Sequence, residues 1–116
     1  MQHFTSVKDA YNIQNLVNEA LLMKKTPYAD KHIGKNRTLG LLFFNASLRT
    51  RLSTQKAAQN LGMEVMIMNV GADSWQLEMN EGVIMNGDKA EHISEAAAVV
   101  GSYCDIVGVR SFPGLV

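Results

Sequence analysis

An unbroken apolar segment near the middle of the chain, Thr38 to Phe44, limits the possible folds more than any other part of the sequence. A run of this length between polar residues is typical of a strand that is buried on both faces of its sheet. Helices must then cover both sides of that sheet. The segment therefore predicts an α/β fold with a mostly parallel sheet and helices on both faces.

Helix and strand patterns alternate along the rest of the chain, as such a fold requires. The predicted elements are a helix from Ser6 to about Lys25, a strand at 38–44, a helix at about 48–61, a strand at 63–69, an irregular segment at 70–87, a helix from Asp88 to Gly101 and a strand at 105–110. Strands that are joined through helices make right-handed crossovers, which keeps the three strands parallel.

Capping residues set the expected helix ends. Ser47 is a suitable N-cap for the second helix, and Gly62 supplies its C-terminal stop. Asp88 and Glu91 have the spacing of a capping box at the start of the third helix, which Gly101 should end. These residues predict where each helix begins and ends.

The size and charge of the chain exclude several classes of protein. Its 116 residues, 47% of them hydrophobic, suit one domain over residues 1–116 and are too few for a two-domain cleft. Eleven basic and eleven acidic residues give a net charge of zero, which argues against a nucleic-acid or anionic-membrane partner. No apolar run reaches the length of a membrane span.

The cysteine and histidine content argues against a disulfide framework and a metal site. Cys104 is the single cysteine, and the three histidines show no metal-ligand spacing. The first residues lack the basic and apolar pattern of a secretory signal, so the cytoplasm is the expected location. Because Cys104 precedes a buried strand, we interpret it as packing and not as a nucleophile.

Three segments far apart in the sequence should meet at one edge of the sheet. In open parallel sheets, ligands bind beyond the carboxyl ends of the strands. Here those ends lead into 44–47, 69–75 and 110–112. We therefore look for the chemistry of this protein among these segments.

Two arginines in the first turn of the second helix break a local rule. A helix N-terminus favours anions, so Arg49 and Arg51 each face an unfavourable dipole interaction of roughly 0.3 to 1 kcal/mol. Such a violation often marks a functional site, although both side chains could equally point into solvent. Arg110 ends a strand at the same edge and could converge with Arg49 on a phosphate, or could pair with an acid at the rim.

Trp75 is the only tryptophan and lies in the polar irregular segment. Its indole offers a large apolar surface and one N–H donor, which suits a subunit contact or a ligand lid. Packing of the Trp75 side chain against its own domain is an equally good interpretation.

The segment FNASLRTR, from Phe44 to Arg51, together with Gly108-Val109-Arg110, resembles the aspartate/ornithine carbamoyltransferase superfamily. The phosphate-binding motif of that superfamily is usually Ser-Thr-Arg-Thr-Arg, and Leu48 departs from it. Leucine at this position resembles the acyl-ornithine branch, the N-acetylornithine and N-succinylornithine carbamoyltransferases. Further similarities to this branch lie at 43–45, 53–58, 75, 82–85 and 87–88. The similarity covers essentially the whole chain, but those enzymes are much longer and have two domains.

The resemblance implies a binding site for carbamoyl phosphate. The implied phosphate ligands are Ser47, the Leu48 backbone N–H, Arg49, Thr50 and, from a neighbouring subunit of a homotrimer, Trp75. Thr50 and Arg110 would polarise the carbamoyl oxygen as the catalytic residues, and Arg110 would stabilise the tetrahedral oxyanion. The resemblance implies neither a cofactor nor a metal.

The resemblance also implies the substrate and leaves one choice open. The acceptor would be an N-acyl-ornithine in arginine biosynthesis. The family position that matches Ala90 carries glutamate in acetyl-ornithine enzymes and proline in succinyl-ornithine enzymes. Alanine lacks the carboxylate that would repel a succinyl group, so N-succinylornithine is favoured and N-acetylornithine comes next.

The family's His-x-x-Gln motif and its amino-acid-binding domain are absent from these 116 residues. The chain is thus expected to be an incomplete carbamoyl phosphate-binding domain that is inactive by itself. A non-catalytic anion-binding or assembly module that keeps this fold is the main alternative. A dinucleotide-binding domain fits the order of elements but lacks the glycine fingerprint.

Overall fold

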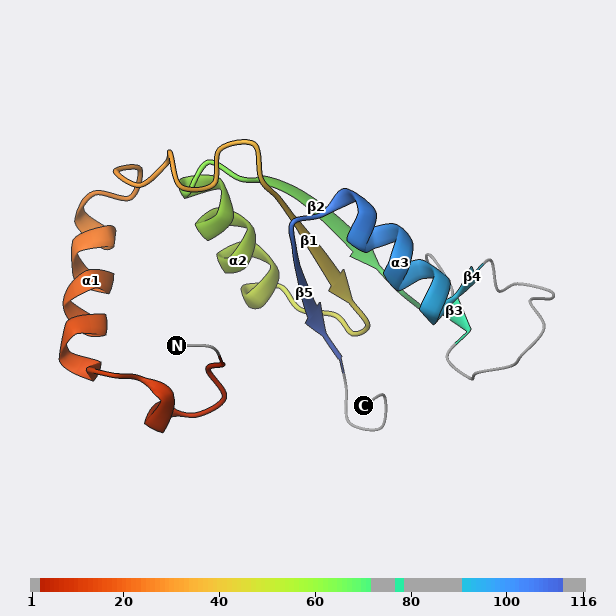
Figure 1. Cartoon of the computed structure of the whole chain (residues 1–116), viewed down its shortest axis with the longest axis horizontal. Helices are drawn as coiled ribbons and strands as arrows, with labels where there is room; N and C mark the ends of the chain where they lie inside the picture. Colours follow the sequence, from red (N-terminus) through yellow and green to blue (C-terminus); the bar gives the residue numbers. More distant parts are fainter. Residues whose placement is uncertain (1–2, 72–76, 79–90, 112–116) are drawn as a thin grey trace. The chain divides into compact units, whose positions relative to one another are not determined.

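The computed structural model describes residues 3–71, 77–78 and 91–111. By its internal contacts the chain divides into two compact units, Met1–Asp30 and Lys31–Val116. The second unit contains the predicted sheet, and Figure 1 traces its strands and helices in the colours of the sequence.

The first unit begins with two helical segments instead of the single helix predicted from Ser6. A short 3-10 helix, η1 (Val7–Asp9), precedes α1 (Ile13–Lys25). The Asp9 carboxylate accepts hydrogen bonds from the backbone N–H groups of Thr5 at 2.8 Å and Ser6 at 3.0 Å. These bonds hold residues 5–9 in a short separate turn. The prediction that one continuous helix starts at Ser6 was therefore wrong.

A separate cap starts α1. The Asn12 side chain accepts a hydrogen bond from the Asn15 backbone N–H at 3.1 Å, which makes Asn12 the N-cap. At the other end, the Thr26 hydroxyl donates to the Leu22 carbonyl at 3.0 Å. The helix ends at Lys25, as the sequence predicts.

Three strands form a parallel sheet in the order β2-β1-β5. β1 (Thr38–Phe43) is central, between β2 (Glu64–Asn69) and β5 (Ile106–Arg110). In this register Phe43 lies opposite both Asn69 and Arg110. The parallel arrangement confirms the predicted α/β class, and the carboxyl ends of all three strands meet at one edge (Figure 1).

One face of the sheet packs against α2 (Arg49–Asn60). Ala58 of this helix is 4% exposed and joins the β1 side chains in one buried cluster. The β1 members of that cluster are Leu39, Leu41 and Phe43. Because alternate residues of a strand point to opposite faces, these three define the α2 face.

The opposite face of the sheet is the one next to α3 (Ile93–Tyr103). Gly40 lies so close to Cys104, directly after α3, that a Cβ atom on Gly40 would be 2.6 Å from the Cys104 Sγ. Ala96 and Val100 of α3 are buried. Helices therefore cover both faces, as predicted, and Figure 1 shows α2 and α3 on opposite sides of the strands.

Gly62 ends α2 in the predicted way. Its φ is 84°, in the left-handed region that favours glycine. Its N–H donates to the Gln59 carbonyl at 3.0 Å and so satisfies a free carbonyl of the last turn. A Cβ here would lie 2.0 Å from the Lys31 carbonyl oxygen, so the chain has no room for a side chain.

The start and end of α3 differ from the prediction. Glu91 and His92 form a short strand, β4 (Glu91–His92), which pairs in parallel with β3 (Leu77–Glu78). Because its backbone is extended, Glu91 cannot complete a capping box, and α3 begins at Ile93. Gly101 lies inside the helix, where a Cβ would meet no described atom within 4 Å apart from the neighbouring helix backbone, and α3 continues to Tyr103.

At the edge where β1 begins, Asp105 ties β1 to β5. Its carboxylate accepts from the Thr38 backbone N–H at 2.8 Å and from Arg37 Nη1 at 3.3 Å. The Asp105 N–H in turn donates to the Thr38 carbonyl at 2.9 Å. The Thr38 N–H, followed by the Arg37 side chain, lowers the pKa of the Asp105 carboxyl below its ordinary value.

Among the helices that the structure describes, none is long and apolar enough to cross a membrane.

Candidate functional site

The candidate site lies where the carboxyl ends of the three strands meet. The Phe44 N–H donates to the Arg110 carbonyl at 3.0 Å, and the Val70 N–H donates to the Phe43 carbonyl at 2.9 Å. These bonds continue the strand pairing for one residue past β1 on both sides. The chain then leaves the sheet and enters α2, so residues 45–48 lie directly beyond this edge.

The first turn of α2 begins one residue later than predicted. Leu48 occupies the N-cap position with helical dihedral angles, φ −87° and ψ −54°, and no side-chain hydrogen bond caps the helix. The prediction of Ser47 as N-cap was therefore wrong. Ser47 is half-buried just before the helix, and Leu48 is 75% exposed. The backbone N–H groups in the first turn of α2 therefore have no capping side chain as a hydrogen-bond partner.

Arg110 and Thr50 meet across this edge. Arg110 Nη1 donates to the Thr50 Oγ1 at 2.8 Å, although 60 residues separate them in the sequence. Thr50 is the second residue of α2, and Arg110 is the last residue of β5. Both were predicted as catalytic residues, and the structure brings them into direct contact.

Arg49 is exposed at the first position of α2. No hydrogen bond or ion pair links it to another described residue. Its placement is compatible with either interpretation of the sequence, an anion ligand or a solvated charge. Thr50, and not Arg49, is the observed partner of Arg110.

A pocket of about 640 Å³ lies beside the first turns of α2. Ser47 and Leu48, which belong to the predicted phosphate motif, line it together with side chains from β1, β2 and α2. The remaining lining residues are Phe43, Ala46, Arg51, Leu52, Gln55 and Asn69. The predicted phosphate motif thus borders a cavity large enough for a small metabolite.

Three polar residues that line this pocket were not assigned to the site from the sequence: Arg51, Gln55 and Asn69. Arg51 had been noted as a charge at an unfavourable helix end and as the last residue of the segment that carries the family resemblance, without a role of its own. A signal was present for Gln55, because it follows Arg51 by four residues and so shares its helix face. Asn69 ends the β2 pattern, and its pairing with Phe43 follows from the parallel register.

Two predicted site residues, Trp75 and Ala90, lie outside the described residues. Cys104, interpreted as packing, is half-buried against Gly40. Within the described ranges there is no group of three or more His, Cys, Asp or Glu residues that could hold a metal ion.

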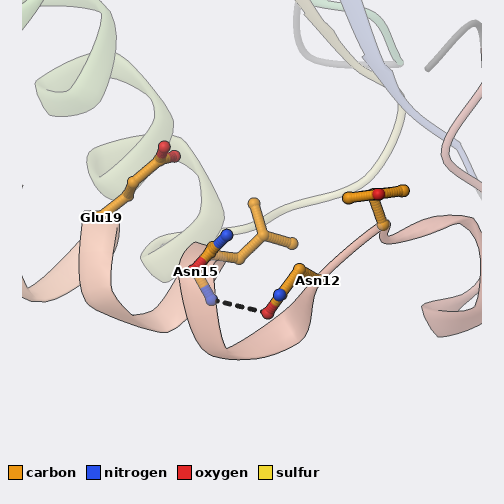
Figure 2. A pocket seen from close by; sticks show the side chains of 5 residues that line it. Asn12, Asn15 and Glu19 are labelled. Carbon is orange, nitrogen blue, oxygen red and sulfur yellow. Dashed lines mark hydrogen bonds between the residues drawn. The ribbon is translucent and has the colours of Figure 1, made fainter.

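A smaller pocket, of about 150 Å³, lies on α1 in the first unit. Figure 2 shows it from close by, with Asn12, Asn15 and Glu19 labelled. The hydrogen bond drawn there is the one by which Asn12 caps α1. Because the two amide residues are already explained by the helix cap, this pocket offers no separate chemistry.

Comparisons with known proteins identify the family. Residues 2–115 match the family described as aspartate/ornithine carbamoyltransferase, carbamoyl-P binding domain. The chain is 52% identical over 112 residues to an N-succinylornithine carbamoyltransferase of Bacteroides thetaiotaomicron, covering 97% of this chain and 35% of the relative. It is 38% identical over 118 residues to an N-acetylornithine carbamoyltransferase of Xanthomonas campestris, covering 100% of this chain and 34% of the relative.

Solved structures agree with these sequence relatives. A crystal structure of acetylornithine transcarbamylase complexed with acetylcitrulline superposes with a TM-score of 0.73 and 38% identity, over 98% of this chain and 34% of that one. The chain spans about a third of the length of the relatives it matches. It belongs to the aspartate/ornithine carbamoyltransferase family and corresponds to the carbamoyl phosphate-binding domain of that family.

Proposed function

We propose that this chain supplies the carbamoyl phosphate-binding part of an enzyme that transfers a carbamoyl group to the side-chain amine of an N-acyl-ornithine. The observation that carries the proposal is the Arg110 to Thr50 hydrogen bond of 2.8 Å at the carboxyl edge of the sheet. It joins two residues of the predicted site beside the Ser47–Leu48 segment. In this proposal residues 1–116 form one carbamoyl phosphate-binding domain.

The phosphate of carbamoyl phosphate binds at the start of α2 in this proposal. Ser47, the Leu48 N–H, Arg49 and Thr50 hold its oxygens, and the helix dipole favours the same negative charge. The absence of a side-chain cap on α2 supports this role, because the free N–H groups remain available to a ligand. A bound phosphate also removes the unfavourable interaction between Arg49 and the helix dipole.

The reaction then follows from charge placement. The uncharged amine of the acceptor attacks the carbamoyl carbon, and Arg110 and Thr50 polarise the carbamoyl oxygen and stabilise the oxyanion. This attack forms the new C–N bond and gives a tetrahedral intermediate, whose collapse breaks the C–O bond to phosphate. The amine gives one proton to the departing phosphate, and Arg49 stabilises the hydrogen phosphate that leaves.

N-Succinylornithine is the favoured acceptor and N-acetylornithine the second choice. The 52% identity to an N-succinylornithine carbamoyltransferase, against 38% to an N-acetylornithine enzyme, supports this order. A solved variant of N-acetyl-L-ornithine transcarbamylase with alanine in place of one glutamate is complexed with carbamyl phosphate and N-succinyl-L-norvaline. Loss of a glutamate is therefore compatible with a succinyl ligand in that protein, as Ala90 suggests for this one.

The proposal extends to the assembly and the pathway. A homotrimer, in which Trp75 of one subunit reaches the site of its neighbour, would complete the phosphate site. Arginine biosynthesis is the pathway and the cytoplasm the location that this function implies.

The test uses a fused enzyme, in which this chain is followed by the part of the Bacteroides thetaiotaomicron relative that lies beyond the matched region. The fused enzyme should form N-succinylcitrulline from carbamoyl phosphate and N-succinylornithine. Its Arg110→Ala variant should lose most of this activity. A folded fused enzyme that binds phosphate but forms no product would support a non-catalytic anion-binding module instead.

A further inference from the structure

The side of β5 that faces away from β1 is an open edge of the sheet. β5 is the last strand in the order β2-β1-β5, and no described strand pairs with its outer side. Proteins usually protect such an edge with a charged residue, a proline or a bulge. The segment Ile106–Val109 contains no charge and no proline, and its register with β1 is continuous. β5 therefore lacks these protections.

The two helices leave apolar side chains of β5 uncovered on both faces of the sheet. Ile106 lies on the α2 face by its register with β1, yet it is 54% exposed. Val107 and Val109 lie on the α3 face and are 42% and 59% exposed. On the other edge strand, β2, Val65 and Ile67 pack against the buried cluster under α2. The coverage of the sheet by helices is thus incomplete at β5.

The residue pattern of β5 suits pairing with a second copy of itself. Two identical edge strands that meet around a twofold axis perpendicular to the sheet run antiparallel. With the axis at Gly108, Val107 lies opposite Val109 of the second copy, and Ile106 lies opposite Arg110 of the second copy. The two Arg110 residues are then four positions apart, roughly 13 Å along the strands. This exceeds the screening length of about 8 Å at physiological ionic strength, so the pairing brings no like charges into contact.

We propose that a second copy of this chain pairs with β5 by antiparallel strand addition centred on Gly108, so that two three-stranded sheets join into one of six strands. The contact goes beyond the proposed function and does not depend on it. Backbone groups of both edges gain partners, and the valines of the two copies pack together on the α3 face. Because five residues per copy make a small interface, we expect a dissociation constant of roughly 10 to 100 µM.

The first test is sedimentation equilibrium of the chain over a series of concentrations, which should show a monomer–dimer equilibrium. Val109→Lys places a charge opposite Val107 of the second copy and should weaken association about tenfold or more. Met66→Lys is the matched control, because Met66 is 46% exposed on the α3 face of the other edge strand. Thermal melting should show that both variants are folded. A chain that stays monomeric, or equal weakening by the two variants, overturns the proposal.

The second test checks the register by cross-linking, in a Cys104→Ala background that has no other thiol. Residues directly opposite each other in an antiparallel pair lie within reach of a disulfide bond. Under mild oxidation, a mixture of Val107→Cys and Val109→Cys chains should therefore cross-link several times more than either variant alone. Equal cross-linking in all three samples would show non-specific association and overturn the proposal.

The main competing occupant of this edge is the added part of the fused enzyme. In the same background, alkylation of a Val109→Cys thiol, followed by mass spectrometry of the peptide that contains it, measures whether the edge is covered. If the chain alone is monomeric and this thiol is protected only in the fused enzyme, the added part and not a second copy covers β5. That result overturns the proposal and leaves the proposed function intact.

Discussion

Arg110 and Thr50 are held together by a 2.8 Å hydrogen bond between the guanidinium and the hydroxyl, across 60 residues of sequence. The bond fixes the end of β5 against the first turn of α2. Arg110 donates through Nη1, which leaves its other N–H groups available to a ligand. The two side chains are therefore pre-oriented at the edge where the phosphate motif lies, which favours stabilisation of a developing charge without rearrangement.

Thr50→Val tests this relationship in the fused enzyme. Valine keeps the shape of the side chain but removes the hydroxyl, so Arg110 loses its partner and substrate loses one donor. We expect kcat/KM for carbamoyl phosphate to fall about tenfold or more, equivalent to roughly 1.5 to 3 kcal/mol for a hydrogen bond to a charged group. Ser53→Ala is the control, since that hydroxyl donates to the Thr50 carbonyl at 3.3 Å and to no other residue in the part of the chain that the structure describes. Equal kinetics for wild type and Thr50→Val would contradict the assignment of Thr50.

The sequence predicts the sheet well because its signal is local. The apolar run from Thr38 specifies β1, and the parallel order follows from the alternation with helices. Residues 44–48 and Arg110 therefore come to one edge, as expected. The contact between Arg110 and Thr50 could not be predicted, because it depends on the exact height and rotation of α2 over the strands.

The ends of two predicted helices were not predicted correctly, because they depend on backbone hydrogen bonds whose partners the sequence does not show. The sequence does not show that Asp9 closes η1 on itself, or that Glu91 pairs with Leu77 across 13 intervening residues. Helical periodicity continues through both places, so it predicts helix where hydrogen bonding ends it. Arg51 was noted for its charge and its place in the matched segment, but only the structure shows that it lines a pocket together with Asn69 of β2.

The chain by itself should show no appreciable carbamoyl transfer. It spans about a third of its relatives, and positioning of the amine supplies much of the reduction in the barrier. A colorimetric assay for N-acyl-citrulline with the purified chain tests this, with the fused enzyme as positive control. A rate comparable to that of the fused enzyme would refute the prediction.

Acid should weaken the fold through Asp105. Its hydrogen bonds hold the pKa of the folded carboxyl below its ordinary value, so folding binds fewer protons at this group. The stabilisation is present above the unfolded pKa, near about 4, and is lost as pH falls through the folded pKa. Thermal melting should therefore show that Asp105→Asn lowers the Tm at pH 7 more than at pH 3. Glu19→Gln on α1 is the matched control, and an equal loss for Asp105→Asn at both pH values would exclude this linkage.

Gly40→Ala should destabilise the protein by overpacking. A Cβ atom there would lie 2.6 Å from the Cys104 Sγ, and a clash of this kind in a core costs about 1 to 3 kcal/mol. Cys104→Ala removes the sulfur, so the double variant should recover part of the loss in urea unfolding. Gly101→Ala lies inside α3, where the described residues outside the neighbouring helix backbone leave space for a Cβ, and should instead stabilise by roughly 0.5 to 1 kcal/mol. Independent effects of Gly40→Ala and Cys104→Ala would show that the two residues do not meet.

The last prediction concerns the acyl group. Ala90 carries no charge, and a carboxylate at this position would repel the terminal carboxylate of a succinyl group without affecting an acetyl group. In the fused enzyme, kcat/KM should therefore be higher for N-succinylornithine than for N-acetylornithine. Ala90→Glu should shift the ratio towards the acetyl substrate, by about tenfold if the two charges come as close as an ion pair in a partly buried site. Ala90→Gln has nearly the same volume as Ala90→Glu but no charge, so it separates repulsion from crowding. A wild-type preference for the acetyl substrate, or equal shifts in the two variants, would remove Ala90 as the selectivity residue and leave the carbamoyl phosphate site as proposed.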